Sequence, residues 1–395
     1  MRLTYFHYLS NGDTALNHVR QFVGAAESAG HEVDVCSLES VELPSSHQLS
    51  LQQKLFGLLK RHLRFYLHEP KKIWSNLPSY RIAASALDRQ QPDAVLVRNE
   101  LLSLGAIVAA KRHGFPLVLE VNSPAVESRQ YLDQYLHLPR LPEAVELKQL
   151  TLADGITVVS DSLRAHFLER YGLQPEKFTI VPNGADLSRF RPDSLPDPDL
   201  AIAVGEAITV GFVGSFEKWH GPGLLCDMVL RVAAARPESQ FLLVGDGPGR
   251  KAVEEKLDSL AHRVILTGRV PHNRIPGIVA CMDIGVQPES AFYQSPLKVI
   301  EWMAAGRAIV APDYGPLREV IESGREGLLF NPGNAEDLVA AVVKLIDDPG
   351  LRQRLGQSAH RRATDSLSWS HNAARVMEAC QRAIESRSRR AQQRR

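Results

Sequence analysis

Short apolar runs alternate with helix-like segments along nearly the whole chain. This alternation is typical of strand–helix units that stack around parallel sheets. The predicted strands fall into two series, 2–9, 32–36, 94–97, 116–121, 155–159 and 178–181, followed by 208–213, 240–244, 263–266, 283–286, 308–310 and 327–329.

A proline-rich segment separates the two series of strands. "RFRPDSLPDPDLAIAVGEA", residues 189–207, combines prolines with acidic residues and predicts a linker. A chain of 395 residues exceeds what one core usually organises. We therefore predict an α/β protein with two doubly wound parallel-sheet domains, 1–190 and 191–368. A final helix over 369–388 is expected to cross back to the first domain, before a basic tail at 389–395.

The composition is that of an ordinary globular protein, with 44% hydrophobic and 23% charged residues. A formal net charge of +1 argues against a nucleic-acid binder. No apolar run is long enough to span a bilayer, and the opening "RLTYFHYL" predicts a strand rather than a signal peptide, so we expect a cytoplasmic protein. The cysteines have no metal-ligand spacing and are expected to be reduced and structural; they are Cys36, Cys226, Cys281 and Cys380.

Basic residues concentrate in two segments. Residues 50–81 carry seven Lys or Arg against one Glu, and residues 381–395 carry six Arg against one Glu. Within the first, "LQQKLFGLLKRHLRFYLHEPKKIW" mixes bases with Leu, Phe, Tyr and Trp in a helix-compatible pattern. Two interpretations remain open: residues 51–81 contact the cytoplasmic face of the membrane, or they form an amphipathic helix packed on the domain. "RSRRAQQRR" predicts a disordered tail.

Two glycine-containing loops follow strands in the second half. "FVGSFEKWHGPGLL", residues 212–225, passes through Gly214 into a helix, with Lys218 and His220 placed to add positive charge. Such a turn can present backbone N–H groups to an anion, but a simple strand-to-helix turn fits equally well. "FLLVGDGPGRKAVEEKL", residues 241–257, repeats the design with a spacing that does not match the dinucleotide fingerprint, so NAD binding is not expected.

The stretch "SPLKVIEWMAAGRAIVAP", residues 295–312, places polar side chains along one edge of a predicted helix that leads into a buried strand. In the first turn, Ser295 offers a hydroxyl and Lys298 a cation, and Glu301 follows one turn later. These groups suit a pyrophosphate and an adjacent ribose diol. The alternative is a capped helix with a surface ion pair between Lys298 and Glu301.

Several consecutive motifs resemble the retaining glycosyltransferases of family 4, which have the two-domain GT-B architecture. In the second half these are "FVGSFEKWHG", "FLLVGDGPG", "VILTGRV", "SPLKVIEWMAAGRAIVAPDYGPLREVI" and "GREGLLFNPGNAEDLVAAVVKLIDD". In the first half they are "HVRQFVGAAESAGHEV" and "ITVVSDSLRAHFLERYGLQPEKFTIVPNGADLSRFRP". The resemblance covers most of the chain except roughly residues 40–90 and the tail. It implies two Rossmann-like domains that face each other across a cleft.

The resemblance also implies roles for individual residues. Glu301 would bind the ribose of a nucleotide-sugar donor, and the first turn of its helix would bind the pyrophosphate. Gly12 would let the backbone approach the donor closely. The implied catalytic residues are Asn122, Lys298 and Glu301. The implied donor-binding residues are Gly12, Gly214, Ser215, Lys218, His220, Gly245, Gly268, Arg269, Val270, Tyr293, Gln294, Ser295, Pro296, Leu297, Lys298 and Glu301.

The chain departs from the family pattern at four of these positions. Tyr293 stands where family members often have a second glutamate before Glu301. The identity of the donor sugar therefore cannot be inferred from the family. Ser215 and His220 replace the usual arginine and lysine, and Asn122 stands where many members have a histidine near the transferred sugar.

Two carboxylates, Glu120 and Glu127, flank Asn122. Glu120 fits a buried, hydrogen-bonded strand carboxylate as well as a catalytic one.

The resemblance implies transfer of a hexosyl group from a UDP- or GDP-sugar to a glycan or lipid-linked acceptor, in cell-surface polysaccharide assembly. Front-face attack leaves the protein mainly to position the reactants and neutralise the leaving diphosphate, so we expect no cofactor and no metal. The Asp-x-Asp at Asp197 and Asp199 is split by Pro198 and is expected to be a solvated loop. Two alternatives remain: an epimerase of the same fold and a non-catalytic nucleotide-sugar-binding paralogue.

Overall fold

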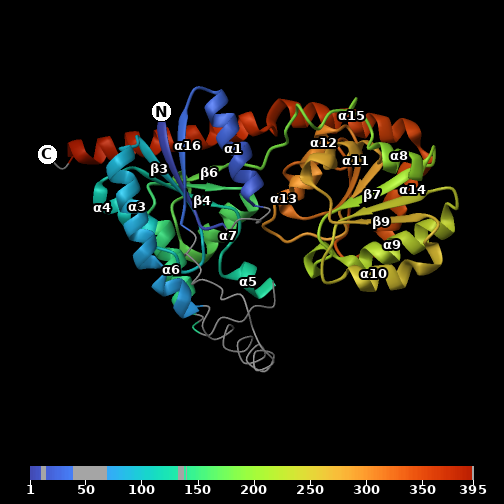
Figure 1. Cartoon of the computed structure of the whole chain (residues 1–395), viewed down its shortest axis with the longest axis horizontal. Coiled ribbons are helices and arrows are strands. Elements are labelled where there is room, and N and C mark those ends of the chain that lie inside the picture. The colour runs from blue at the N-terminus through green and yellow to red at the C-terminus, as the bar shows by residue number, and fades with distance from the viewer. Residues whose placement is uncertain (10–14, 39–68, 132–137, 139, 394–395) are drawn as a thin grey trace, which may run out of the picture. The chain divides into compact units, whose positions relative to one another are not determined.

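The structure is a computed structural model, and it describes residues 1–9, 15–38, 69–131, 138 and 140–393. The chain divides into two compact units (Figure 1). Unit 1 comprises Met1–Val159, Leu163–Val181 and Ala373–Arg395, and unit 2 comprises Ser160–Ser162 and Pro182–Asn372. The predicted domain boundary lies near residue 190. In the structure, the chain passes from unit 1 to unit 2 between Val181 and Pro182.

Unit 1 is built on a six-stranded parallel sheet in the order β2-β1-β3-β4-β5-β6. Its strands are β1 (Arg2–His7), β2 (Glu32–Ser37), β3 (Ala94–Arg98), β4 (Leu117–Val121), β5 (Gly155–Val158) and β6 (Phe178–Ile180). Its helices are α1 (Leu16–Ser28), α3 (Asn76–Gln90), α4 (Gly105–His113), α5 (Glu127–Tyr131), α6 (Arg140–Leu152), most of α7 (Asp161–Tyr171) and most of α16 (Trp369–Gln393).

Two helices far apart in the sequence cover one face of the unit 1 sheet. Phe22 of α1 and Cys380 of α16 are fully buried in one apolar cluster with Leu3 and Tyr5 of β1. The final helix therefore belongs to the core of unit 1 from Ala373 onward. It was predicted over 369–388, and it extends to Gln393.

Unit 2 is built on a second six-stranded parallel sheet, in the order β12-β11-β10-β7-β8-β9. Its strands are β7 (Thr209–Val213), β8 (Gln240–Val244), β9 (Val264–Gly268), β10 (Ile284–Val286), β11 (Ala308–Pro312) and β12 (Leu328–Phe330). Its helices are α8 (Pro198–Val204), α9 (Pro222–Ala235), α10 (Arg250–Leu257), α11 (Ile275–Ala280), α12 (Leu297–Ala304), α13 (Gly315–Arg318), α14 (Ala335–Asp347) and α15 (Pro349–Ser366).

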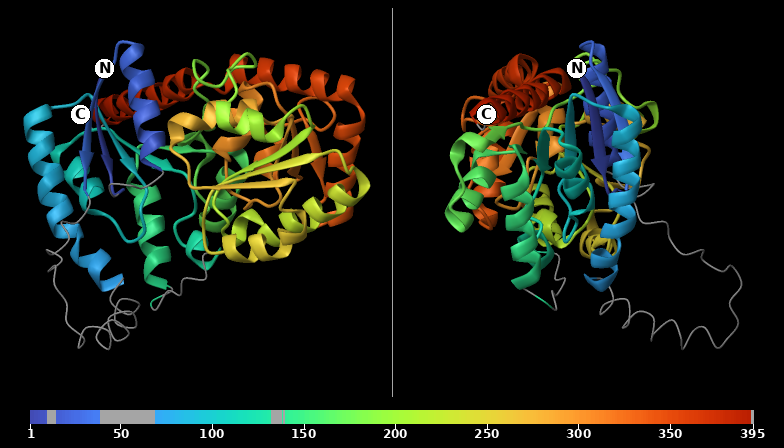
Figure 2. Two further views of the ribbon diagram at one scale, coloured as in Figure 1. Left: turned by 45° about the vertical axis from the view of Figure 1, so that its right-hand side comes forward. Right: turned by 90° about the vertical axis from the view of Figure 1, so that its left-hand side faces the viewer.

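The unit 2 sheet is covered on both faces, as Figures 1 and 2 show. Along β8, Phe241 and Leu243 pack with α9, α10 and α14, whereas Leu242 and Val244 pack with α11, α12 and α15. All four side chains are at most 1% exposed. A strand buried on both faces must be apolar at every position, which explains the continuous run "FLLV".

The predicted linker is partly wrong. Residues 198–204 form the helix α8 because Pro198 sits at a helix N-terminus, where its fixed φ is favourable, and the Asp197 side chain accepts a hydrogen bond from the Leu200 N–H at 3.4 Å. Val204 adds a buried contact to unit 2. The prolines therefore start a helix here instead of keeping the chain extended.

All twelve predicted strands are present, each within two residues of its predicted ends. Among the described residues, no helix combines the length and the apolar character needed to cross a bilayer.

Candidate functional site

The candidate site in unit 2 lies at the carboxyl edge of its sheet, where doubly wound sheets bind ligands. Because all strands are parallel, the loops that follow β7, β8, β9 and β10 emerge at the same edge. The predicted residues on these loops or at their ends are Gly214, Ser215, Lys218, His220, Gly245, Gly268, Arg269, Val270, Tyr293, Gln294, Ser295, Pro296 and Leu297. Gly12 lies outside the described residues.

Backbone hydrogen bonds join the starts of the loops after β7 and β8 to the ends of the neighbouring strands β8 and β9. The Gly214 N–H donates to the Val244 carbonyl at 2.9 Å, and the Gly245 N–H donates to the Gly268 carbonyl at 3.0 Å. Gly245 has φ +136°, and a Cβ added there would stand 1.8 Å from the Gly214 carbonyl oxygen. Only glycine lets the β7 and β8 loops approach this closely.

Lys298, in the first turn of α12, carries a buried ammonium group. Its Nζ has no hydrogen-bond partner among the described residues and lies 4.8 Å from the centre of the Phe212 ring. A Cβ at Gly214 would be 2.6 Å from this Nζ, so the glycine leaves room for the ammonium group. Burial lowers the pKa of Lys298 to about 7, against an opposing effect of Glu301. An unpaired buried cation at a helix N-terminus is suited to an anion.

His220 lies beside Lys298 and is uncharged. Its Nδ1 donates to the Ser215 carbonyl at 2.6 Å, so the remaining ring nitrogen, Nε2, is an acceptor. Burial and the neighbouring Lys298 lower the pKa of His220 to about 3, although the Ser215 bond opposes them. The expectation of a positive charge at His220 is therefore wrong for the protein alone. The sequence could not show the desolvation that causes this shift.

The Glu301 side chain is contacted by His272, a residue outside its own helix. Its Oε1 lies 3.6 Å from His272 Nε2, and its side chain is 12% exposed. Arg189 NH2 donates to the His272 carbonyl at 2.9 Å, and Arg189 NH1 lies 3.3 Å from His272 Nδ1. Arginine can only donate, so Nδ1 accepts and Nε2 carries the proton that faces Glu301. No ion pair joins Lys298 and Glu301 in the described structure.

Ser295 differs from its expected role. The helix begins at Leu297 with Pro296 as its N-cap, so Ser295 precedes the first turn. Its carbonyl accepts a hydrogen bond from Asn183 Nδ2 at 2.7 Å, and its hydroxyl lies 3.4 Å from the Asn183 N–H. Asn183 therefore fixes the chain just before α12.

The rest of the β10–α12 loop is shaped by its own side chains. Gln294 Oε1 accepts from the Ala291 N–H at 3.2 Å, and Tyr293 is only 7% exposed. Of the predicted base-pocket residues, Val270 packs on the apolar cluster around α11 and α12, whereas Arg269 is exposed. Lys218 lies in the short 3-10 helix that ends at His220.

The carboxyl edge of the unit 1 sheet holds a second polar cluster. Asn122 follows β4, and its Nδ2 donates to Glu120 Oε1 at 2.9 Å. Glu120 is buried and also accepts from Arg98 NH1 at 3.2 Å. Glu127 lies in a separate group, 3.3 Å from His166 Nε2 and 3.2 Å from Arg170 NH1.

The Asp-x-Asp pair serves the fold. Asp197 caps α8 and accepts two hydrogen bonds from Arg274 at 2.9 Å, and Asp199 lies 3.4 Å from the same guanidinium. Within the described parts of the chain, no group of three or more His, Cys, Asp or Glu side chains is arranged to hold a metal ion.

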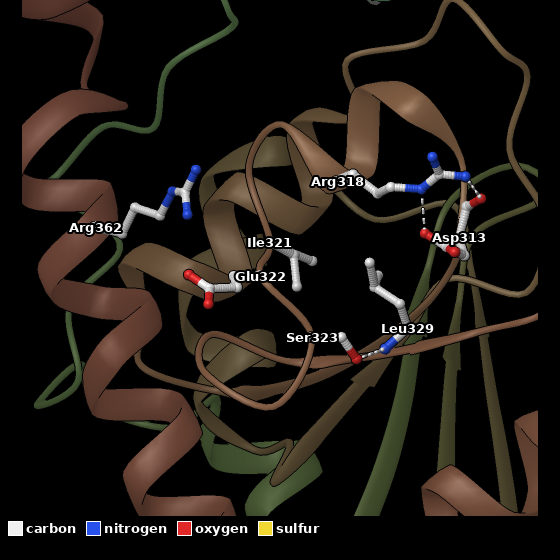
Figure 3. Close-up of a pocket in the computed structure, with 7 residues that line it drawn as sticks. All are labelled: Asp313, Arg318, Ile321, Glu322, Ser323, Leu329 and Arg362. Atoms are coloured by element: carbon white, nitrogen blue, oxygen red, sulfur yellow. Dashed lines mark hydrogen bonds and ion pairs between the residues drawn. The ribbon is translucent and has the colours of Figure 1, made fainter.

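Unit 2 also contains a pocket of about 570 Å³ beside β11 and β12 (Figure 3). Its charged groups are already paired: Arg318 donates to Asp313, and Arg362 donates to the Glu319 carbonyl at 2.6 Å. Glu322 is paired with Arg325 at 3.1 Å. The pocket therefore offers no unpaired charge comparable with Lys298.

Sequence reasoning assigned no role to Asn183, Arg189, His272 or Phe212. The first two stand in "VPNGADLSRF", a quoted family motif, and that membership was the available signal. Phe212 is the first residue of the quoted motif "FVGSFEKWHG", whereas His272 lies outside the quoted motifs and only the fold brings it to Glu301.

Two parallel-sheet units in one chain, with glycine loops and a buried lysine at one sheet edge, match the architecture of GT-B glycosyltransferases. The sequence matches the family described as Glycosyltransferase Family 4 over residues 15–189 and the family described as Glycosyl transferases group 1 over residues 207–348. The chain belongs to the family 4 glycosyltransferases and is a glycosyltransferase.

A relative by sequence agrees with this family, and two solved structures agree with the fold. A glycogen synthase of Mycobacterium tuberculosis is 24% identical over 370 residues, which cover 89% of this chain and 87% of that protein. Sucrose-phosphate synthase of Thermosynechococcus elongatus matches with a TM-score of 0.70 at 18% identity, over 98% of this chain and 99% of that one. The Anabaena protein HepE, in complex with UDP, matches with a TM-score of 0.69 at 17% identity, over 96% of this chain and 99% of that one.

Proposed function

We propose that this protein transfers a hexosyl group from a UDP- or GDP-sugar to a glycan or lipid-linked acceptor, with retention of the anomeric configuration. The buried, unpaired Lys298 ammonium is the observation that carries the donor assignment. It lies against Gly214, where backbone can approach closely, and one helical turn from the part-buried carboxylate of Glu301. A pyrophosphate on Lys298 and a ribose diol on Glu301 would satisfy both groups.

UDP is the first nucleotide to test. HepE, which shares the fold, is known in complexes with UDP and with UDP-glucose. GDP remains in the proposal because the family resemblance leaves the nucleobase open. Cell-surface polysaccharide or glycoconjugate assembly is the process we propose for the reaction.

The chemistry proposed for unit 2 is electrostatic. As the glycosidic bond breaks, negative charge grows on the leaving diphosphate, and protonated Lys298 together with the N–H groups at the start of α12 would stabilise it. His220, held neutral, contributes an acceptor rather than a charge. Front-face attack leaves the protein mainly to position the reactants and stabilise the leaving diphosphate, so we propose that transfer needs no metal and no cofactor.

A ligand screen followed by an activity assay tests this function. UDP, GDP, ADP and their sugars are compared by thermal shift, because a ligand that binds the native state raises the melting temperature. We expect a shift with UDP- or GDP-sugars that is lost in Glu301→Ala, and product with the donor's anomeric configuration by NMR. Glu322→Ala, on an exposed glutamate of the same unit, is the matched control. No shift and no transfer with any nucleotide sugar would refute the proposal, and activity lost in EDTA and restored by magnesium or manganese would refute metal independence.

We also propose that unit 1 contacts the cytoplasmic face of the membrane, which would suit a lipid-linked acceptor. Residues 51–68 of the expected contact segment lie outside the described residues. In the remainder, Trp74 is 81% and Leu77 is 54% exposed, on a stretch that also exposes Lys71 and Arg81. An exposed tryptophan among basic residues suits an anionic lipid interface.

Sedimentation with liposomes tests the membrane contact. We expect binding to anionic vesicles at low salt, and weaker binding for Trp74→Ser and for Lys71→Gln with Arg81→Gln. Ile202→Ser, which alters an 85% exposed apolar side chain in unit 2, serves as control. Wild-type protein that stays in the supernatant would refute this contact without affecting the donor assignment.

A further inference from the structure

Glu120 is a buried carboxylate near the carboxyl end of β4, with partners from β1, α1, β3 and the loop that follows β4. Its Oε2 accepts a hydrogen bond from the Tyr5 hydroxyl. Its Oε1 is 3.2 Å from Arg98 NH1, 2.9 Å from Asn122 Nδ2 and 3.4 Å from His18 Nε2. Glu120 is 6% exposed and Tyr5 is fully buried. Such a fully partnered carboxylate can hold its neighbours in fixed orientations.

The protonation of this cluster follows from its donors. Arg98 NH1 lies 3.4 Å from His18 Nδ1, and a guanidinium can only donate, so Nδ1 accepts. The proton of His18 is therefore on Nε2, facing Glu120. Burial lowers the pKa of His18 to about 4, which keeps the ring neutral near pH 7. Burial alone would raise the pKa of Glu120, but Arg98, the neighbouring His18 and the hydrogen bonds from Tyr5 and Asn122 together hold that pKa below its ordinary value. The cluster thus contains one anion, Glu120, and one cation, Arg98.

This charge arrangement fixes the orientation of Asn122. A carboxylate accepts and cannot donate, so the amide nitrogen of Asn122 must face Glu120. A flipped amide would set two acceptor oxygens against each other. The amide oxygen, Oδ1, is consequently the end that points away from the cluster. Asn122 is half-buried and directly follows β4, at the sheet edge where ligands of doubly wound domains bind.

We infer that Glu120 is a positioning residue, which orients Asn122 so that Oδ1 accepts a hydrogen bond from a hydroxyl group of a sugar substrate. This inference rests on the proposed transferase function and adds to it the class of group that Asn122 recognises. Histidine at this position would present a ring nitrogen. The amide of an asparagine can adopt two orientations, with either its nitrogen or its oxygen toward the substrate. The hydrogen bond to Glu120 selects the orientation in which Oδ1 faces away from the cluster.

A double-mutant cycle tests the inference on transfer kinetics with saturating and limiting concentrations of each substrate. Asn122→Ala removes Oδ1 and should lower kcat/KM about tenfold, the effect of one lost hydrogen bond. Glu120→Gln should lower it to a similar degree, because a neutral amide no longer dictates the orientation of Asn122. In the Asn122→Ala background, Glu120→Gln should have almost no further effect. A rise in KM for the donor or for the acceptor identifies which of the two carries the hydroxyl.

The cycle separates positioning from a purely structural role. If the two single effects multiply in the double variant, Glu120 acts independently of Asn122 and the inference is wrong. Tyr5→Phe is the matched control: it removes another partner of Glu120 and should lower the melting temperature while leaving kcat/KM within about twofold. An unchanged kcat/KM in Asn122→Ala also overturns the inference. Wild-type protein without transfer activity would instead refute the proposed function.

A second variant keeps the test decisive if Glu120→Gln does not fold. Asn122→Asp keeps the side-chain size but places a carboxylate against Glu120. We expect low activity at pH 8 that recovers relative to wild type as the pH falls toward 5, because the protonated carboxyl group can again donate to Glu120 and leave an oxygen free. In the wild type His18 stays neutral over this range, and Arg98 stays charged. A constant ratio of variant to wild-type activity from pH 5 to pH 8 would contradict the inference.

Discussion

The ammonium group of Lys298 lies 4.8 Å from the centre of the Phe212 ring, and among the described residues it has no hydrogen-bond partner. The ring face offers partial compensation for the lost hydration, through a cation–π contact. Glu301, on the same helix, also favours the charged form, but burial dominates and lowers the pKa of Lys298 to about 7. Burial of the Lys298 charge therefore lowers the stability of the protein. Buried groups with strongly shifted pKa values are typical of binding sites.

Replacing Lys298 by methionine should stabilise the protein and weaken donor binding. The unfolded pKa is near 10.5 and the folded one about 7, so the unfolded state binds more protons between these values. The cost of the buried charge is complete below pH 7 and disappears above pH 10.5. At pH 6.5 we expect Lys298→Met to raise the free energy of unfolding by roughly 1–3 kcal/mol. Urea denaturation and nucleotide-sugar titration measure the two effects.

The control for this variant is Lys251→Met. Lys251 is 87% exposed, so its replacement should change neither stability nor donor affinity appreciably. A Lys298→Met protein that is less stable than wild type at pH 6.5 would show that Lys298 has a stabilising partner in solution.

Donor affinity should fall as the pH rises above 7. A diphosphate favours protonated Lys298, so binding above the free-enzyme pKa takes up a proton and the dissociation constant increases, approaching about tenfold per pH unit. Calorimetry in buffers of different ionisation enthalpy measures the proton uptake directly. A nucleotide sugar is the right ligand, because its diphosphate has no terminal phosphate that titrates near pH 6. Lys298→Met should remove the pH dependence, whereas an equally steep dependence in this variant would assign it to another group.

The strands could be predicted because burial on both faces leaves a continuous apolar run, such as "FLLV" in β8. The combination of prolines and acidic residues predicts a linker and not the helix α8, yet Asp197 and Pro198 form a helix start. Local sequence can support either outcome, and the contact of Val204 with the core decides between them.

The candidate site could be predicted only in outline. The spacing of Lys298 and Glu301 indicated one helix edge, and the structure places both there. His220 is neutral because of desolvation and because of Lys298, which lies 78 positions later in the chain. The spacing of residues in the sequence reveals neither effect. In the same way Asn183 reaches Ser295 across 112 positions.

Gly245→Ala should disrupt the loops that surround the site. The new Cβ would meet the Gly214 carbonyl oxygen at 1.8 Å, and φ +136° is unfavourable for alanine. Because the obstacle is backbone, the β7 and β8 loops must separate, and we expect a loss of roughly 2–4 kcal/mol in the free energy of unfolding with a large rise in donor KM.

Gly223→Ala provides the matched control for this substitution. Gly223 lies in the first turns of α9, and a Cβ there meets nothing within 4 Å. Alanine should therefore be neutral or slightly stabilising. If both variants behave alike in thermal denaturation, the close approach of Gly245 to Gly214 has no energetic importance.

Asn183→Ala and Ser295→Ala should have unequal effects, because the two side chains differ in how they hold the start of α12. Asn183 Nδ2 donates to the Ser295 carbonyl at 2.7 Å, whereas the Ser295 hydroxyl is 3.4 Å from the Asn183 N–H, which is long for a hydrogen bond. We expect Asn183→Ala to cost about 1–2 kcal/mol of stability and to raise the donor KM, and Ser295→Ala to change both little. Denaturation and steady-state kinetics on the two variants give the comparison. A donor KM raised more by Ser295→Ala than by Asn183→Ala, with wild-type stability, would instead show that the hydroxyl binds the donor directly and that the loop anchor is secondary.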